Sequence, residues 1–469
     1  MPRLPRTPLL AVTLFIGFAG CSGARKNLRK ADGYLDDGRW SAAIRTYQKV
    51  LDKKPGEPRA LMGVAEAWIQ SGEPQKALVP AQVAAEVKAP GSAAALGRAL
   101  LANGRGKDAV TPLEGAVESG EDDAQIKLLL AEARLAAEDI PGAVSAAEDA
   151  LPAGGGPAAS ALAAWTHMRA GSCDRAQRLA ARAITAALDD GSVQAEAAAV
   201  FRGCADPDQA SSAANTARAL IDDDAQAWFD AAARYSSGGD TEGALRRMSW
   251  LRATFPTDGR YAKDLGGLWL ALGDAGRAEA NLTAALNLPP YSDGAEVQGI
   301  RFADRRADAL TPEERRAEAA GLWRILAKAR GTLGDKAGIA EALEMAAREG
   351  RSDDPNEWLE AARAWLAAGK PGKAVEPAQQ AIALRPDHPA TQVTAAEAYA
   401  KAGDLARAIG HARVAWNLQP TNLDTSLMLA DLYLARGENR EARRIVEVSL
   451  SHHPGEPRLK TALKRAQGY

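Results

Sequence analysis

The sequence of 469 residues predicts an all-α solenoid of about twelve helix-turn-helix units. Three observations support this fold class. A turn glycine is followed five residues later by an alanine, and most successive alanines lie 33 or 34 residues apart. Apolar residues recur at i, i+3 and i+7 beside the turns, which places one apolar stripe on each helix. Prolines follow the second helix of many units and stop it before the next unit begins.

Each repeated residue type suits its place in a helix hairpin. Glycine permits the tight turn between two helices, and alanine lets the two helices cross closely. The turn glycines are Gly38, Gly72, Gly104, Gly171, Gly239, Gly273, Gly334, Gly369, Gly403 and Gly437. Ile339 takes the alanine position in one unit. Each hairpin buries its apolar face only against its neighbours, so the stability of the array is roughly a sum of unit and interface terms.

The first residues of the chain have the pattern of an export signal. Arg3 and Arg6 precede an apolar run at 9–19, which is too short to span a bilayer as a helix. The run ends in the sequence Phe-Ala-Gly-Cys at 18–21, which resembles the lipobox of bacterial lipoprotein signals. This resemblance implies cleavage just before Cys21 and a lipid on its thiol. The alternative is an ordinary signal peptide with a chance cysteine.

The lipid anchor also predicts where the protein lies. Two or more acyl chains hold a protein stably on a membrane, since each buried CH₂ group contributes about 0.8 kcal/mol. In bacterial lipoproteins an Asp after the lipidated cysteine tends to retain the protein at the inner membrane, and Ser22 stands there instead. The resemblance therefore implies an outer-membrane lipoprotein of the cell envelope that faces the periplasm.

The repeat resembles the tetratricopeptide repeat (TPR) over nearly all of the chain after Cys21. The unit at 225–258 carries the motif on Trp228, Ala231, Ala232, Tyr235, Gly239, Ala244, Leu245, Met248, Leu251 and Pro256. The units at 355–388, 389–422 and 423–456 repeat the scheme. The resemblance implies a right-handed superhelix that binds other proteins, with the first helix of each unit lining a concave groove.

These patterns divide the chain into five segments. They are a lipoprotein signal peptide at 1–20, a TPR array of about eight repeats at 21–292, an insertion loop at 293–311, a TPR array of about four repeats at 312–456 and a C-terminal capping helix at 457–469. Thr311, Pro312 and the two acids that follow predict one extended helix from about 312 to 332. The insertion is either a variable loop or a partner-binding element. The glycine-rich stretch at 152–157 is either a longer turn between repeats or a hinge.

Composition and motifs point to no catalytic, cofactor or metal site. The formal net charge is −2, whereas nucleic-acid binding favours a basic surface. The five histidines are scattered, without a spacing suited to a metal, and no phosphate-binding loop or nucleophile elbow occurs. After Cys21 the remaining cysteines are Cys173 and Cys204, and such a pair in an exported chain suggests a disulfide. Two free buried thiols are the alternative.

The groove-facing positions, projected from the repeat, change in character along the chain. Early units carry acids such as Glu132, and the last units carry Glu397 and Asp431. The candidate binding residues are Lys263, Arg324, Lys328, Arg363, Trp165 and Phe229. The four basic residues would hold an acidic peptide or polymer by charge-assisted hydrogen bonds, and the alternative is a solvated face of mixed charge. For the tryptophans as a group, core packing is the alternative to a ligand cage.

The sequence therefore predicts a non-catalytic scaffold or assembly factor for protein–protein interaction, anchored by lipid in the bacterial envelope. Its expected partners are other envelope proteins, an acidic peptide or a polysaccharide, and no nucleic acid. A second hypothesis is a periplasmic adaptor of an exopolysaccharide export system, a role that similar TPR lipoproteins have. The third is an enzyme with an unrecognised site, and no arrangement of acid, base, nucleophile or metal ligand supports it.

Overall fold

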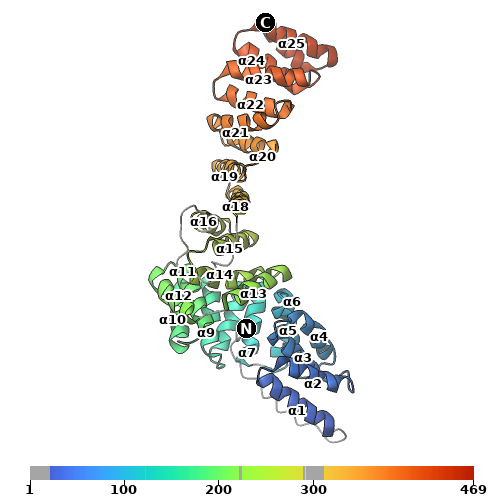
Figure 1. Cartoon of the computed structure of the whole chain (residues 1–469), viewed down its shortest axis with the longest axis vertical. Helices are drawn as coiled ribbons and strands as arrows, with labels where there is room; N and C mark the ends of the chain where they lie inside the picture. Colours follow the sequence, from blue (N-terminus) through green and yellow to red (C-terminus); the bar gives the residue numbers. More distant parts are fainter. Residues whose placement is uncertain (1–21, 122, 221–223, 289–290, 292–310, 469) are drawn as a thin grey trace. The chain divides into compact units, whose positions relative to one another are not determined.

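The computed structural model describes residues 22–121, 123–220, 224–288, 291 and 311–468 (Figure 1). These residues form helices joined by short turns, and none of them lies in a strand, which confirms the predicted all-α solenoid class. They fall into two compact units: unit 1 holds the described residues up to Leu272, and unit 2 holds those from Gly273 onward. The predicted signal peptide, Cys21 and residues 293–310 of the predicted insertion lie outside the described residues.

Unit 1 is a series of antiparallel helix hairpins, and most of its helices pack against the next one along the chain. Its elements are α1 (Ser22–Asp36), α2 (Trp40–Leu51), α3 (Pro58–Gln70), the 3-10 helix η1 (Pro74–Ala77), α4 (Leu78–Glu86), α5 (Ser92–Ala102), α6 (Gly106–Glu118), α7 (Ala124–Ala136), α8 (Ile140–Ala150), α9 (Gly156–Arg169), α10 (Cys173–Ala186), α11 (Gly191–Gly203), α12 (Pro207–Leu220), α13 (Asp224–Gly238), α14 (Thr241–Thr254) and α15 (Gly259–Ala271). The glycine-rich stretch at 152–157 forms the connection between α8 and α9, within unit 1.

The repeated glycines and alanines lie at turns and helix crossings, as the sequence predicts. The turn glycine Gly38 adopts φ +72°, a left-handed conformation that side chains with a Cβ rarely take. Ala43, Ala109 and Ala143 are completely buried where helices cross. At Gly63 an added methyl group would overlap the ring of Tyr47, so this helix crossing requires the missing side chain.

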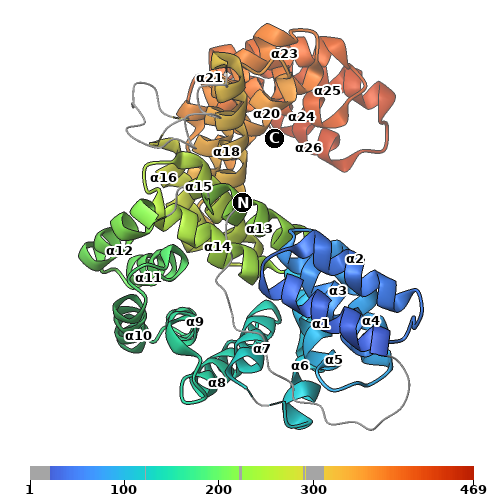
Figure 2. The same ribbon diagram turned by 60° about the horizontal axis from the view of Figure 1, so that its bottom comes forward.

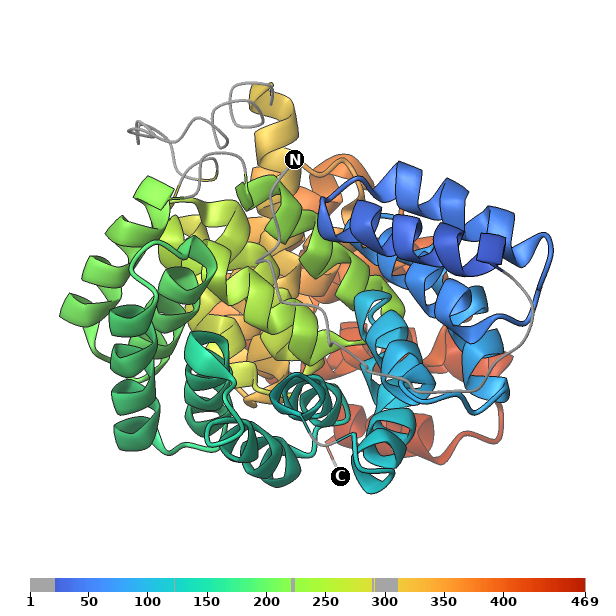
Figure 3. The ribbon, with the colours of Figure 1, turned by 90° about the horizontal axis from the view of Figure 1, so that it is seen from below.

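One hairpin of unit 1 leaves the simple stacking order. Helix α14 packs against α11 and α12 and also reaches α7, more than a hundred residues earlier in the chain. Figures 2 and 3 show the α13–α14 hairpin inside an arc formed by α5, α7, α9 and α11. These four are the first helices of their hairpins, so α14 lies on the face that the family resemblance assigns to a binding groove. We call this the first-helix face of unit 1.

Unit 2 continues the hairpin pattern. Its helices are α16 (Ala275–Leu286), α18 (Pro312–Thr332), α19 (Lys336–Glu349), α20 (Pro355–Ala367), α21 (Pro371–Leu384), α22 (Pro389–Lys401), α23 (Leu405–Leu418), α24 (Leu423–Ala435), α25 (Asn439–His452) and α26 (Pro457–Gln467). The extended helix predicted at about 312 to 332 is confirmed as α18. Thr311 and Glu314 form a reciprocal capping box at its start.

The C-terminal helix α26 covers the last hairpin. It packs against α24 and α25, and Leu459, Ala462 and Ala466 join the core of the final repeats. A terminal helix with one apolar and one polar face protects the open end of a solenoid. Among the helices of the described residues, none combines the length and the apolar character that crossing a membrane requires.

Candidate functional site

The first helices of the early hairpins, α1, α3, α5 and α7, each carry a charged residue at an equivalent position. Asp32, Glu66, Arg98 and Glu132 each lie six residues before the turn position of their hairpin. Three of them take part in ion pairs: Arg98 contacts Glu66 at 3.1 Å, and Arg59 contacts Asp32 at 2.6 Å. These ion pairs join α1 to α3 and α3 to α5. The charged positions at this end of the face are therefore used to connect consecutive hairpins.

Farther along this face, the charges bind α14 of the same chain. The Nε and Nη2 atoms of Arg246 donate to the two carboxylate oxygens of Glu196 on α11, at 2.6 and 2.8 Å. Its Nη1 donates to Glu132 on α7 at 2.6 Å. Burial alone would raise the pKa of Glu132, but Arg246 and Arg247 hold it below the usual value. The Arg246 side chain is 9% exposed and that of Glu196 is 4% exposed, so the Arg246–Glu196 pair is almost free of solvent.

A second ion pair and a buried helix cap fix the beginning of α14. Arg169 at the end of α9 donates to the carboxylate of Glu242, whose side chain is buried, and stacks on the ring of Trp269. Asp240 caps α14 by accepting a hydrogen bond from the Gly243 backbone N–H at 2.7 Å. Burial raises the pKa of Asp240 to about 6. The hairpin is therefore anchored by charge-assisted contacts to α7, α9 and α11.

The turn between α13 and α14 also approaches the earlier repeats closely. A methyl group added at Gly238 would overlap the backbone of Asn103 and Gly104, in the turn after α5. A methyl group added at Gly104 would meet the backbone of Tyr235 in α13 at 2.7 Å. Glycine on both sides thus permits two backbones to touch. Together with the ion pairs, this contact shows that the first-helix face of unit 1 is filled by the protein's own hairpin.

The burial pattern of α9 and α11 agrees with a filled face. In α9, buried residues occupy nearly every position from Ala159 to Met168, and in α11 every residue from Val193 to Phe201 is buried. A helix of a solenoid that faces solvent on its groove side would leave one stripe exposed. Both helices are covered on that side because the α13–α14 hairpin lies there.

The structure corrects the prediction for Trp165 as a groove-binding residue. Its side chain is 1% exposed, so it presents no surface that a ligand could bind. Phe229 belongs to the covering hairpin itself and is half-buried, with its ring centroid 6.5 Å from that of Tyr261. Neither aromatic side chain offers an open groove surface. Glu132, which the repeat also placed in the groove, binds Arg246 as described above.

The four predicted basic residues are divided between the units. Lys263 lies on α15 in unit 1, where it is half-buried and engaged in contacts. Arg324 and Lys328 lie one turn apart on α18, and Arg363 lies on α20, both in unit 2. All three are exposed. The structure therefore brings Arg324, Lys328 and Arg363 to consecutive first helices of unit 2, which we call the first-helix face of unit 2.

The charges on the first-helix face of unit 2 are only partly neutralised. Arg324 donates to Glu357 on α20 at 2.6 Å, and Arg465 on α26 contacts Asp431 on α24 at 2.7 Å. Between these two pairs, Lys328, Arg363 and Glu397 occupy the equivalent position of three consecutive hairpins, six residues before their turn glycines. None of the three forms an ion pair within the described part of the chain. This face therefore presents two cations and then an anion to solvent.

Apolar side chains border these charges. Leu427, Met428 and Leu434 on α24 are half-buried and pack on the core while exposing the rest of their surface, and Val393 on α22 is also half-buried. In each helix they lie about one turn before or after the charged position. The first-helix face of unit 2 therefore combines apolar patches with separate charges, which suits a protein ligand more than a small polar molecule.

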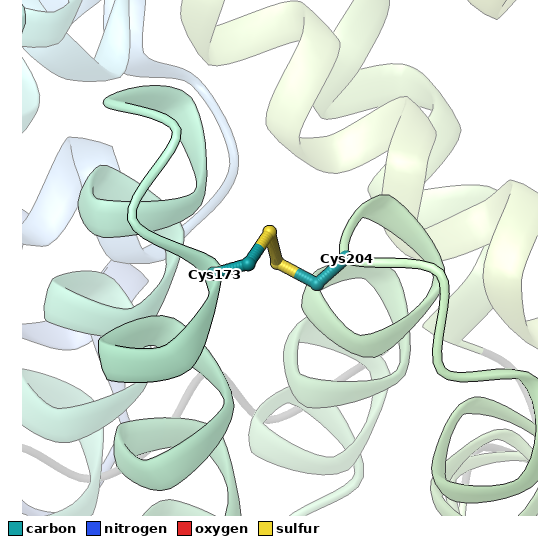
Figure 4. The surroundings of a disulfide bond; sticks show 2 residues. All are labelled: Cys173 and Cys204. Carbon is teal, nitrogen blue, oxygen red and sulfur yellow. A yellow bond between two sulfur atoms is a disulfide. The ribbon is translucent and has the colours of Figure 1, made fainter.

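A disulfide joins two turns on the rim of unit 1. Cys173 at the start of α10 and Cys204 just after α11 are bonded, with their Cα atoms 5.4 Å apart (Figure 4). The bond connects the α9–α10 turn to the α11–α12 turn. It therefore fixes the spacing of α9 and α11, the two helices that are most completely covered by the hairpin.

Models of the tetratricopeptide repeat match residues 28–93, 94–159, 359–421 and 400–466. These ranges cover about half of the chain and lie in both units. The chain is a tetratricopeptide-repeat protein. Proteins of this type generally mediate protein–protein interactions and are usually not catalytic. Within the residues that the structure describes, no group of three or more His, Cys, Asp or Glu side chains is arranged to hold a metal ion.

Solved structures of other TPR proteins are similar to this chain at low sequence identity. The hetero-tetramer of Cut9 and Hcn1 from the APC/C matches at 15% identity, covering 95% of this chain and 96% of the other, with a TM-score of 0.30. Yeast Tom70 matches at 15% identity over 95% of both chains, with a TM-score of 0.27. YrrB, described as a TPR protein with an unusual peptide-binding site, matches at 14% identity over 46% of this chain and 97% of its own, with a TM-score of 0.32. A comparison with curated protein sequences finds no match.

Sequence reasoning missed the residues that fill unit 1. Arg246, Glu242 and Asp240 were assigned only to a regular repeat, and Glu196 had no role. One signal was present in the sequence. Segment 158–166 has apolar or small residues at every position, and segment 193–201 has them at every position except Gln194 and Glu196, which is typical of helices buried on nearly every face. That pattern predicts a covering element, although it does not name α14.

Proposed function

We propose that this TPR protein is a non-catalytic scaffold or assembly factor, anchored by a lipid on Cys21 in the bacterial envelope, and that it holds partner proteins on the first-helix face of unit 2. The observation that carries the proposal is the contrast between the two faces. The face of unit 1 is filled by α14, whereas the face of unit 2 presents Lys328, Arg363 and Glu397 without an ion pair in the described residues. Exposed charges beside apolar patches are ready to bind a complementary protein surface.

Two further observations support the envelope location. The first 21 residues resemble a lipoprotein signal, as described above. The disulfide between Cys173 and Cys204 suits an oxidising compartment, since disulfides are rare in the reducing cytosol. The partners proposed are therefore other proteins of the envelope.

Site-specific cross-linking in living cells tests the binding face. A photo-activatable amino acid at Lys328 or Arg363 is expected to capture a defined set of envelope proteins. The matched control carries the same amino acid at Arg413, an exposed residue of α23, which is a second helix of its hairpin. The proposal fails if the first-helix face and the control position Arg413 capture the same proteins, or if neither captures any. Capture of a polysaccharide synthase or exporter from the first-helix face would favour the adaptor of an exopolysaccharide export system.

The anchor is tested separately. Cys21→Ser should move the protein from the membrane fraction to the soluble fraction and abolish incorporation of labelled palmitate. Ser22→Ala is the matched control and should change neither result. A Cys21→Ser protein that stays on the membrane would remove the lipid from the proposal and leave the binding face unaffected.

A further inference from the structure

We infer that the first-helix face of unit 2 binds its partner as an amphipathic α-helix, which it holds by charge pairs to Arg363 and Glu397. This inference rests on the proposed function, because it names the form of the partner at the same face. The alternative form is an extended peptide. The structure favours the helix because unit 1 of the same chain provides an example, and the charges and helix spacing of unit 2 then set the charge pattern that the ligand needs.

Unit 1 provides the example. Its first-helix face is occupied by an α-helix, α14, and the contacts are charge pairs between that helix and the groove positions of the repeats. Arg246 binds Glu132, which lies six residues before its turn, and also binds Glu196. Apolar residues of α14 complete the contact, since Trp250 packs with Ala195 and Ala217 of the facing hairpin. The repeat architecture of this chain therefore accommodates a helix on this face.

Unit 2 presents the same kind of position without an occupant from its own described residues. Arg363 and Glu397 hold the position equivalent to Glu132 on α20 and α22, and both are accessible to solvent. Glu360 lies one turn before Arg363 on α20, but it forms no ion pair in the described part of the chain, so Arg363 keeps its donors for a ligand. The cation and the anion require opposite charges on the ligand. Lys328 on the preceding first helix, α18, adds a second cation, so the part of the ligand that faces α20 should carry an acid.

The spacing of α20 and α22 sets the spacing of charges on the ligand. The two helices lie side by side, and packed helices have axes about 8–10 Å apart. A helix rises 1.5 Å per residue, so a helical ligand spans that distance in about six or seven residues. An extended chain spans it in about three residues. A helical ligand therefore needs its acid and its base about two turns apart, where both point to the same side.

A pair of peptides distinguishes the two forms of ligand. Both have the same length, one Glu, one Arg and a fluorescent label. In the first, Glu and Arg are seven residues apart in a helical sequence. In the second they are three residues apart in a sequence kept extended by proline. Binding to the lipidated full-length protein in detergent is measured by fluorescence anisotropy. The helical peptide is expected to bind at least about tenfold more tightly than the extended one.

Charge exchange on the protein shows whether the face is responsible. The double variant Arg363→Glu with Glu397→Arg is expected to lose about tenfold in affinity for the helical peptide. It should regain that affinity for a peptide in which Glu and Arg are exchanged, because the pairing is restored. Arg413→Glu on α23 is the matched control and should leave both affinities unchanged. Circular dichroism checks that the helical content of each variant is that of the parent.

The outcomes separate this inference from the proposed function. Equal binding of the two peptides, tighter binding of the extended one, or no binding of either overturns the helical ligand. In each of these cases the proposed scaffold function is tested only by the cross-linking from Lys328 and Arg363. Tight helical binding that charge exchange does not alter also overturns the inference, because the contact then lies elsewhere on the protein.

Discussion

Replacing Arg246 by Met should release α14 from the first-helix face of unit 1. The guanidinium group makes three hydrogen bonds to two carboxylates, and its own side chain is only 9% exposed. Methionine keeps most of the volume of the side chain and removes the charge. The variant therefore removes the cation that Glu196 and Glu132 share, and Glu196 is 4% exposed. While α14 stays in place, water can reach Glu132 only in part and Glu196 hardly at all.

The expected cost follows from the burial of the two carboxylates. Removing one partner of a buried ion pair generally costs about 3–5 kcal/mol. Glu132 is 26% exposed and can be rehydrated in part, which places the cost in the lower part of this range, at about 3–4 kcal/mol. Since 1.4 kcal/mol corresponds to a factor of ten, the opening equilibrium of α14 should rise by roughly 10²–10³-fold.

Hydrogen–deuterium exchange of peptides from 241–254 measures this opening directly. Arg247→Met is the matched control, since Arg247 donates to Tyr235 and to the Gly243 carbonyl inside the hairpin and should cost only about 1–2 kcal/mol. The triple variant Arg246→Met, Glu196→Met and Glu132→Gln should recover most of the protection, because no charge is left buried. Equal exchange in the Arg246→Met and Arg247→Met proteins would refute the role of this network.

Three other perturbations test different parts of unit 1. Burial raises the pKa of Asp240 to about 6 from 3.8, so its contribution to stability is full below about pH 4 and is lost as the pH rises through 6, by at most about 3 kcal/mol. Protection factors of α14 should therefore fall from pH 5 to pH 7, and Asp240→Asn should flatten this slope; equal slopes would contradict the assignment. Cys173→Ser with Cys204→Ser should destabilise unit 1 by about 3–4 kcal/mol, since the bond closes a loop with a separation of 31 residues. Calorimetry with and without reductant checks this, and a reductant effect on the double variant would point to another cause. Gly238→Ala should loosen the hairpin more than Gly239→Ala, whose added methyl meets open space at φ +90°, and similar exchange of α14 in both proteins would argue against the close backbone contact.

The disulfide shows what the positions of two cysteines in the repeat can predict and what they leave open. The sequence offered Cys173 and Cys204 as a pair near helix turns of adjacent units, with free thiols as the alternative. The bond required the two turns to approach within about 7 Å, a condition set by the packing of α9 and α11. The structure meets it, with Cα atoms 5.4 Å apart. Mass mapping of the purified protein without reduction remains the direct chemical test.

The four basic residues show where the repeat pattern gives an incomplete prediction. Lys263, Arg324, Lys328 and Arg363 looked like one stretch when projected from the repeat, because the period assigns each to the same face. The structure places Lys263 in unit 1 and the others in unit 2. A repeat position predicts which side of a hairpin a residue occupies. It contains no information on where the array is divided or on which other segment covers that side.

The sequence by itself determined the fold class, the helices and the terminal cap of this protein. Those features depend on contacts between residues within about one repeat, and the spacing of Gly, Ala and Pro records such contacts directly. Only the tertiary structure decided that the first-helix face of unit 1 is closed, while on that of unit 2 Lys328, Arg363 and Glu397 form no ion pair with the residues that the structure describes. The closing contact joins Arg246 to Glu132 over 114 residues, and its strength comes from burial that neither residue has alone. A periodic pattern cannot encode such a contact. The contact depends on how strongly the helices between α7 and α14 curve, because that curvature brings α14 back to α7.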